Sequence, residues 1–117
     1  GPNGDGIFGS SPWKIASEGP SLVKAAKRFD EPALAWSAAD FRFTQKGEKV
    51  YAYQMRWPEA GQTTIRSFAS GETPRVAQVE LLGYGPVGFE QTGESLNIAL
   101  PQWKPLEGPL GFAIVLD

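Results

Sequence analysis

The sequence predicts an all-β domain, an antiparallel two-sheet β-sandwich of Greek-key type with about seven to eight strands. From residue 40 onward, apolar and polar residues alternate with the period of two that is typical of half-buried strands. Glycine or proline stands at most joints between these segments, where proline removes no hydrogen bond from a strand ladder. The 117 residues, 41% hydrophobic and 21% charged, suit one domain of ordinary globular composition.

The first part of the chain lacks this alternation. Residues 1–19 are rich in glycine, with asparagine and proline among them, and they predict a loop. Ile7 and Phe8 lie in this loop without periodic apolar partners, as expected of a segment that packs on something larger. Residues 20–28 predict one short helix, because a proline opens them and apolar residues follow at helical spacing. We therefore expect a linker over residues 1–19 and a β-sandwich domain over residues 20–117.

Two neighbouring segments predict a β-hairpin. The stretch DFRFT, residues 40–44, places two phenylalanines on one face, and the stretch QKGEK supplies a turn around Gly47. The following stretch VYAYQMRW, residues 50–57, places large side chains on one face, and we expect them to pack in the core: Tyr51, Tyr53, Met55 and Trp57. A platform that stacks on sugars is the alternative interpretation of these aromatic residues.

The remaining strands are predicted from shorter segments. TTIRSF, VAQVELLG, VGFEQ and SLNIAL each alternate between apolar and polar residues, with turns between them. The final stretch LGFAIVL, residues 110–116, is apolar on both faces, and this pattern is typical of a central strand.

The composition excludes several classes of function. A net charge of -2 with scattered basic residues gives no footprint for a nucleic-acid partner, and no apolar run is long enough to cross a membrane. The chain has no cysteine and no histidine, which excludes disulfides, Ser-His-Asp and Cys-His catalysis and nearly all zinc sites. We therefore expect no metal and no cofactor. Paired carboxylates, a lysine or a tyrosine are the remaining routes to chemistry.

Several stretches together carry a resemblance to a known family. NGDGIFGSSPW resembles the N-G-E-x-I-Y-x-x-x-P-W segment of glycoside hydrolase family 29 α-L-fucosidases, with Asp5 and Phe8 in place of the usual Glu and Tyr. SEGP is similar to the family's G-E-G-P, and residues 37–61 resemble its D-I-R-F-T, K-G, V-Y-A and W-P-x-x-G in order. VELLGYGPVGFEQTGESLNIALP is similar to V-x-L-L-G followed by L-x-I-x-L-P. The resemblance covers residues 3–117.

The resemblance implies a C-terminal β-sandwich that follows a catalytic barrel. Family members hydrolyse terminal α-L-fucose with retention, which requires two carboxyl groups about 5–5.5 Å apart. The family's aspartate nucleophile lies in the barrel, and no residue of this chain matches that motif. We therefore assign no catalytic residue and expect this chain alone to be non-catalytic. The resemblance also implies a location outside the cytoplasm: extracellular, periplasmic or, in an animal, lysosomal.

Two functions from different classes follow from these expectations. In the first, the domain buttresses the barrel and can lend a loop to its active site or to an oligomer, with interdomain contacts at Ile7, Phe8 and Trp13. In the second, it is a carbohydrate-binding module for fucosylated glycans, with candidate ligand-binding residues Trp36, Trp103 and Glu18. Structural roles are the alternative for these loop residues. Asp40 is expected to bond nearby backbone N–H groups, because Ser37 precedes it at the spacing of a capping box.

Overall fold

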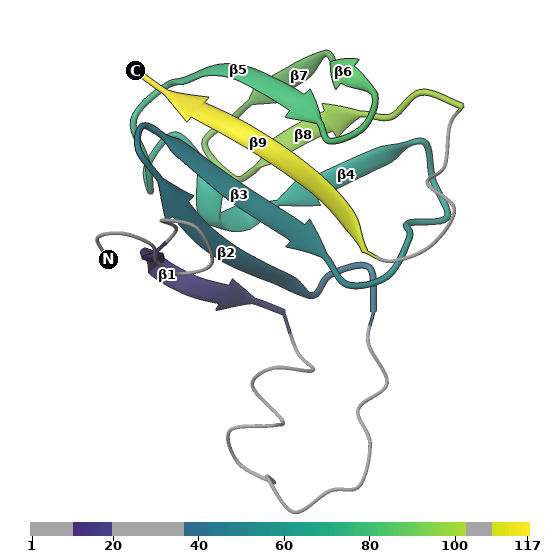
Figure 1. The fold of residues 1–117 in the computed structure, drawn as a ribbon. Coiled ribbons are helices and arrows are strands. Elements are labelled where there is room, and N and C mark those ends of the chain that lie inside the picture. Colours follow the sequence, from purple (N-terminus) through teal and green to yellow (C-terminus); the bar gives the residue numbers. More distant parts are fainter. Residues whose placement is uncertain (1–10, 20–36, 103–108) are drawn as a thin grey trace, which may run out of the picture.

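The computed structural model describes residues 11–19, 37–102 and 109–117, and its strands form two antiparallel sheets that face each other (Figure 1). The six-stranded sheet has the order β1-β2-β3-β9-β5-β6, and the three-stranded sheet has the order β4-β8-β7. The strands are β1 (Ser11–Glu18), β2 (Phe41–Lys46), β3 (Lys49–Gln54), β4 (Gln62–Ile65), β5 (Val76–Leu81), β6 (Gly85–Pro86), β7 (Phe89–Gln91), β8 (Leu96–Ala99) and β9 (Leu110–Leu116). The all-β prediction is thereby confirmed.

Helical structure is limited in the described residues to one short 3-10 helix, η2 (Arg66–Phe68). The helix predicted over residues 20–28 lies outside the described residues. The described part of the chain contains no helix long and apolar enough to span a membrane.

The predicted hairpin is formed by β2 and β3. The two strands pair in register from Phe41 with Gln54 to Lys46 with Lys49, and Gly47 takes a φ of 63° in the turn. Phe41 and Phe43 are buried on the inner face, as predicted.

The inner face of β3 differs from the prediction. Val50, Ala52 and Gln54 are the buried residues of this strand, whereas Tyr51 and Tyr53 lie on the outer face and are half-buried. The expectation that these tyrosines pack in the core is therefore wrong. Both faces of this strand carry apolar residues at period two, so periodicity could not distinguish them. On the inner face the flanking strands place Phe41, Phe43 and Phe112 beside Ala52 and Gln54, and these large neighbours favour smaller side chains on β3.

The prediction of loop structure is wrong for residues 11–18, which form β1 at one edge of the six-stranded sheet. β1 pairs antiparallel with β2, and the register shifts between Pro12 and Ser17. Such an irregularity interrupts the alternation of faces along a strand. The period of two that predicts strands elsewhere is therefore weak in this segment.

The central position predicted for the last strand is confirmed. β9 lies between β3 and β5 and pairs antiparallel with both. Its inner side chains belong to one core that fills the space between the sheets. Trp13 of β1 also belongs to this core, and its indole stacks on Phe68 with ring centroids 4.6 Å apart.

Candidate functional site

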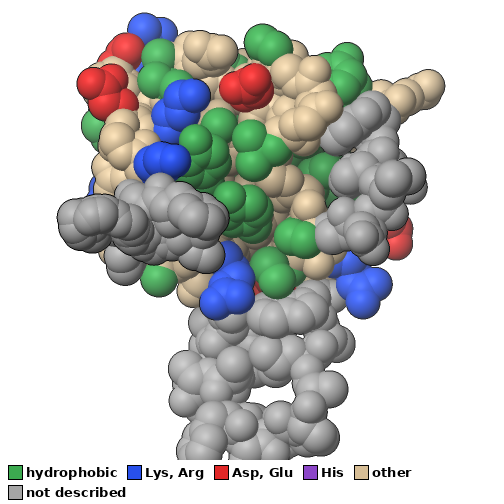
Figure 2. All heavy atoms as spheres, in the orientation of Figure 1, with side chains coloured by type: hydrophobic (Ala, Val, Ile, Leu, Met, Phe, Trp, Pro, Cys, Tyr) green, Lys and Arg blue, Asp and Glu red, His purple; other side chains and the backbone are tan. Residues whose placement is uncertain are grey.

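The outer surface of the six-stranded sheet carries an apolar cluster, which we call the tyrosine face: Tyr51, Tyr53, Leu82, Gly111, Ala113 and Val115. Strand register places Tyr51 beside Ala113 and Tyr53 beside Gly111. Figure 2 views this side of the molecule and shows hydrophobic side chains gathered in the middle of the sheet. Charged residues stand at neighbouring register positions on the same side, with Arg42 opposite Tyr53 and Glu80 opposite Ala113.

The tyrosine face is closely packed around Gly111. A Cβ atom at this glycine would lie 3.3 Å from the ring of Tyr53 and 2.9 Å from Cδ1 of Leu82. The two large side chains therefore cover the middle of β9 from outside, which explains why this strand is buried on both faces. Burial raises the pKa of the Tyr53 hydroxyl above its ordinary value of 10.0, and the neighbouring Tyr51 adds a smaller electrostatic contribution.

The outer face of the three-stranded sheet is different in character. Its exposed or half-buried positions include Gln62, Thr64, Glu90 and Asn97. The Thr64 hydroxyl donates a hydrogen bond to Oδ1 of Asn97 at 3.2 Å, across the β4–β8 pair. The outer surface of the three-stranded sheet is therefore polar, whereas that of the six-stranded sheet has an apolar centre with charged residues beside it.

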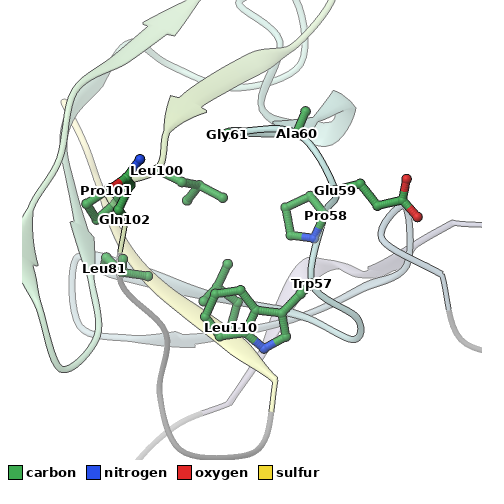
Figure 3. A pocket seen from close by; sticks show the side chains of 10 residues that line it. All are labelled: Trp57, Pro58, Glu59, Ala60, Gly61, Leu81, Leu100, Pro101, Gln102 and Leu110. Atoms are coloured by element: carbon green, nitrogen blue, oxygen red, sulfur yellow. The ribbon is translucent and has the colours of Figure 1, made fainter.

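A pocket of about 770 Å³ opens at one end of the sandwich, between the two sheets. It is lined by Trp57, Pro58, Glu59, Ala60, Gly61, Leu81, Leu100, Pro101, Gln102 and Leu110. Figure 3 shows the carboxylate of Glu59 directed away from the other side chains that line the pocket. The floor includes the core residues Leu81 and Leu110, so the pocket is largely an apolar opening onto the core.

Glu18 has a structural position in the described residues. Its two carboxylate oxygens accept hydrogen bonds from the backbone N–H groups of Arg66 and Ser67, each at 2.8 Å. These groups begin η2, whose own N-cap residue Ile65 makes no side-chain capping bond. Glu18 therefore joins the end of the edge strand β1 to a helix 48 residues further along the chain.

Asp40 closes a turn, as the sequence predicts. Its Oδ2 accepts hydrogen bonds from the backbone N–H of Ser37 at 2.7 Å and from the Ser37 hydroxyl at 2.9 Å, and its side chain is fully buried. Gly19 lies against this turn with a φ of 116°, and a Cβ at this position would collide with Ala39 O and Asp40 Oδ1. The SEGP and DFRFT stretches therefore meet in space.

The other predicted site residues have varied positions. Trp13 is only 7% exposed inside the domain's own core, so its indole offers little surface to a second domain. Ile7, Phe8, Trp36 and Trp103 lie outside the described residues, and their assigned roles stay predictions.

Three of the described carboxylates are bound by other groups of the domain. Asp40 and Glu18 bond the backbone as above, and Asp117 pairs with Arg75 at 2.6 Å. Among the residues that the structure describes, no group of three or more acidic, histidine or cysteine side chains could hold a metal ion.

Sequence reasoning missed the tyrosine face, although β9 contains a usable signal. Gly111 and Ala113 alternate with Leu110, Phe112 and Ile114 along this strand. A central strand with small residues on one face requires large side chains from neighbouring strands to cover that face. The tyrosines of β3 meet this requirement.

Known proteins similar to this chain are α-L-fucosidases. The bovine tissue α-L-fucosidase is 29% identical over 111 residues, and the murine enzyme is 30% identical over 116 residues. These matches cover 95% and 97% of this chain, which spans only 20% and 21% of the relatives' own length. The crystal structure of a Thermotoga maritima α-fucosidase with a mechanism-based inhibitor has the same fold over 93% of this chain and 22% of its own, with a TM-score of 0.65 and 17% identity.

The family model of the α-L-fucosidase C-terminal domain matches residues 36–117, which include every described strand except β1. The strand pattern, the turn at Asp40 and the order of the resembling segments agree with this match. The chain belongs to the α-L-fucosidase C-terminal domain family.

Proposed function

We propose that this chain is the non-catalytic accessory domain of an α-L-fucosidase and that it buttresses the catalytic domain. The observation that carries the proposal is the match to a C-terminal domain family whose curated relatives are much longer proteins, of which this chain spans about a fifth. A domain that occupies so small a share of a glycosidase leaves room for the catalytic machinery elsewhere in the polypeptide.

The chemistry of the described residues supports a non-catalytic role. Retaining glycosidases need a nucleophilic carboxylate and a separate acid/base carboxyl about 5–5.5 Å apart. Asp40 is buried under its turn, Glu18 is bound to two backbone N–H groups, and Asp117 is paired with Arg75. Each of these three carboxylates is already bound by another group of the domain.

The same proposal includes the finer roles expected from the resemblance. The domain works outside the cytoplasm with the rest of its enzyme, and it can lend a loop to the active site or to an oligomer. Ile7 and Phe8 contact the catalytic domain in this account. Trp13 instead packs in the core of this domain.

The proposal is tested with the 117-residue chain itself. We expect no hydrolysis of an aryl α-L-fucoside, and no saturable amide shifts in an NMR titration with L-fucose or a fucosylated trisaccharide, with D-galactose as the control sugar. Saturable, fucose-specific shifts around Trp57, Trp36 or Trp103 would instead identify a carbohydrate-binding module. Measurable hydrolysis that persists after removal of any contaminating enzyme would contradict the non-catalytic role.

A further inference from the structure

We propose that the tyrosine face is the surface through which this domain docks onto the catalytic domain of its enzyme. This inference rests on the proposed function, because it names the contact through which the buttressing acts. Its partner is the catalytic domain of the same polypeptide.

The first argument is the contrast between the two outer surfaces of the sandwich. The three-stranded sheet presents amide, hydroxyl and carboxylate groups, some of which hydrogen-bond to one another along the surface. The six-stranded sheet presents two tyrosine rings together with Leu82 and Val115. A sheet with one solvated face is expected to alternate between apolar and polar side chains, so the central part of the six-stranded sheet departs from that expectation.

The second argument is the anatomy of the tyrosine face. Its centre is aromatic and aliphatic, and the adjacent register positions carry Arg42, Lys49 and Glu80. Protein interfaces are typically enriched in tyrosine at the centre and polar at the rim. Tyrosine also suits a contact of this kind because its ring buries apolar area while its hydroxyl can still find a polar partner.

The third argument identifies the partner. About four fifths of each curated relative lies outside the part matched here, and the matched family is a C-terminal domain, so most of that polypeptide precedes the matched part in those proteins. β1 is the first described strand and lies at the edge of the six-stranded sheet. β1 therefore belongs to the same sheet that carries the tyrosine face.

Rigidity favours the same surface. The face is built on β3 and β9, two neighbouring strands in the interior of the six-stranded sheet. The ring of Tyr53 and the side chain of Leu82 pack against the backbone of β9 at Gly111. A surface that is already ordered loses little conformational entropy when it binds, and this suits a permanent contact between domains.

Hydroxyl-radical footprinting tests the proposal, because the three tyrosines of the chain are its reporters. Labelling rates are compared between the 117-residue chain and the full-length enzyme. We expect the rates of Tyr51 and Tyr53 to fall severalfold in the full-length enzyme, whereas Tyr84, which is 51% exposed in the β5–β6 turn, keeps its rate. Equal rates for Tyr51 and Tyr53 in the two proteins would overturn the proposal. The proposal would also be overturned if the labelling rates of Tyr51 and Tyr53 in the isolated chain fell as its concentration rose, because a second copy of the chain would then be the occupant.

A pair of variants separates docking from folding. Tyr51→Glu places a charge on the tyrosine face, and Thr64→Glu places the same charge on the exposed outer face of β4. In the full-length enzyme, we expect Tyr51→Glu to restore the labelling of Tyr53, whereas Thr64→Glu does not. As isolated 117-residue chains, both variants should keep the circular dichroism spectrum of the parent chain. If Tyr51→Glu unfolds the domain, Val115→Lys replaces it, because Val115 lies at the end of the face.

The failure of this inference is distinguishable from the failure of the proposed function. If deletion of the domain destabilises the catalytic domain but Tyr51 and Tyr53 label equally in both proteins, docking uses another surface and the buttressing role stands. If deletion leaves the stability of the catalytic domain unchanged, the buttressing role itself fails.

Discussion

Replacement of Glu18 by alanine separates a structural role from a sugar-binding role. The carboxylate accepts two backbone hydrogen bonds of 2.8 Å from the start of η2. Alanine leaves both N–H groups without this acceptor and disconnects the end of β1 from η2. Because the sequence alone placed Glu18 among candidate ligand-binding residues, the variant tests that prediction directly.

The magnitude follows from the geometry of these bonds. Hydrogen bonds to a charged group contribute about 1.5–3 kcal/mol each when buried, and loss of a helix cap costs about 0.5–2 kcal/mol. Glu18 is only half-buried and Arg66 is exposed, so water can replace part of each interaction. We therefore expect Glu18→Ala to lower the free energy of unfolding by about 2 kcal/mol. For a domain of this size the loss corresponds to a fall in Tm of about 8 °C.

Differential scanning calorimetry of the isolated domain measures this loss, and Glu48→Ala in the exposed β2–β3 turn is the matched control. Glu18→Gln keeps one acceptor oxygen and should lose about half as much stability. The reasoning is refuted if Glu18→Ala melts at the temperature of the parent chain. Loss of fucose affinity without loss of stability would assign Glu18 to a ligand site instead.

Three further predictions concern the turn and the tyrosine face. Gly19→Ala should lower the free energy of unfolding in urea by about 2 kcal/mol or more, because the φ of 116° at this position disfavours a side chain and the new Cβ would meet Asp40. An unchanged urea midpoint would contradict this. Gly111→Ala should lower the free energy of unfolding by less than about 1 kcal/mol, because the end of the Leu82 side chain can rotate away. Gly111→Val should lower it by about 1–3 kcal/mol. Equal melting temperatures for the two variants would argue against the packing described. The raised pKa of Tyr53 means that the folded state favours the neutral phenol, so its stabilising contribution is complete below about pH 10 and is lost as the pH rises through the higher folded pKa. Tyr53→Phe should weaken this alkaline loss of stability, and unfolding curves of both proteins above pH 10.0 measure the difference.

The sequence predicted those parts of the fold where one periodic signal dominates. Phe41 and Phe43 alternate cleanly with polar residues, and Gly47 marks the turn, so β2 and its hairpin were predictable. β9 was predictable as a central strand because both of its faces are apolar. The capping interaction of Asp40 was also predictable, since it depends on a residue only three positions away.

Features that depend on distant contacts could not be predicted in the same way. The faces of β3 carry competing apolar residues, and the choice between them depends on the volume left by the phenylalanines of other strands. The irregular pairing of β1 conceals its strand pattern. The role of Glu18 depends on a helix 48 residues away, which no local pattern shows.

The central claim is that this domain stabilises the catalytic domain of an α-L-fucosidase without taking part in the reaction. Thermal inactivation of the full-length enzyme, compared with the same enzyme truncated before β1, tests the claim most directly. The account predicts that the truncated enzyme keeps the KM of the parent for an aryl α-L-fucoside at low temperature but loses activity at a clearly lower temperature. Equal inactivation temperatures together with a raised KM would contradict the claim, since the domain would then act on substrate and not on stability.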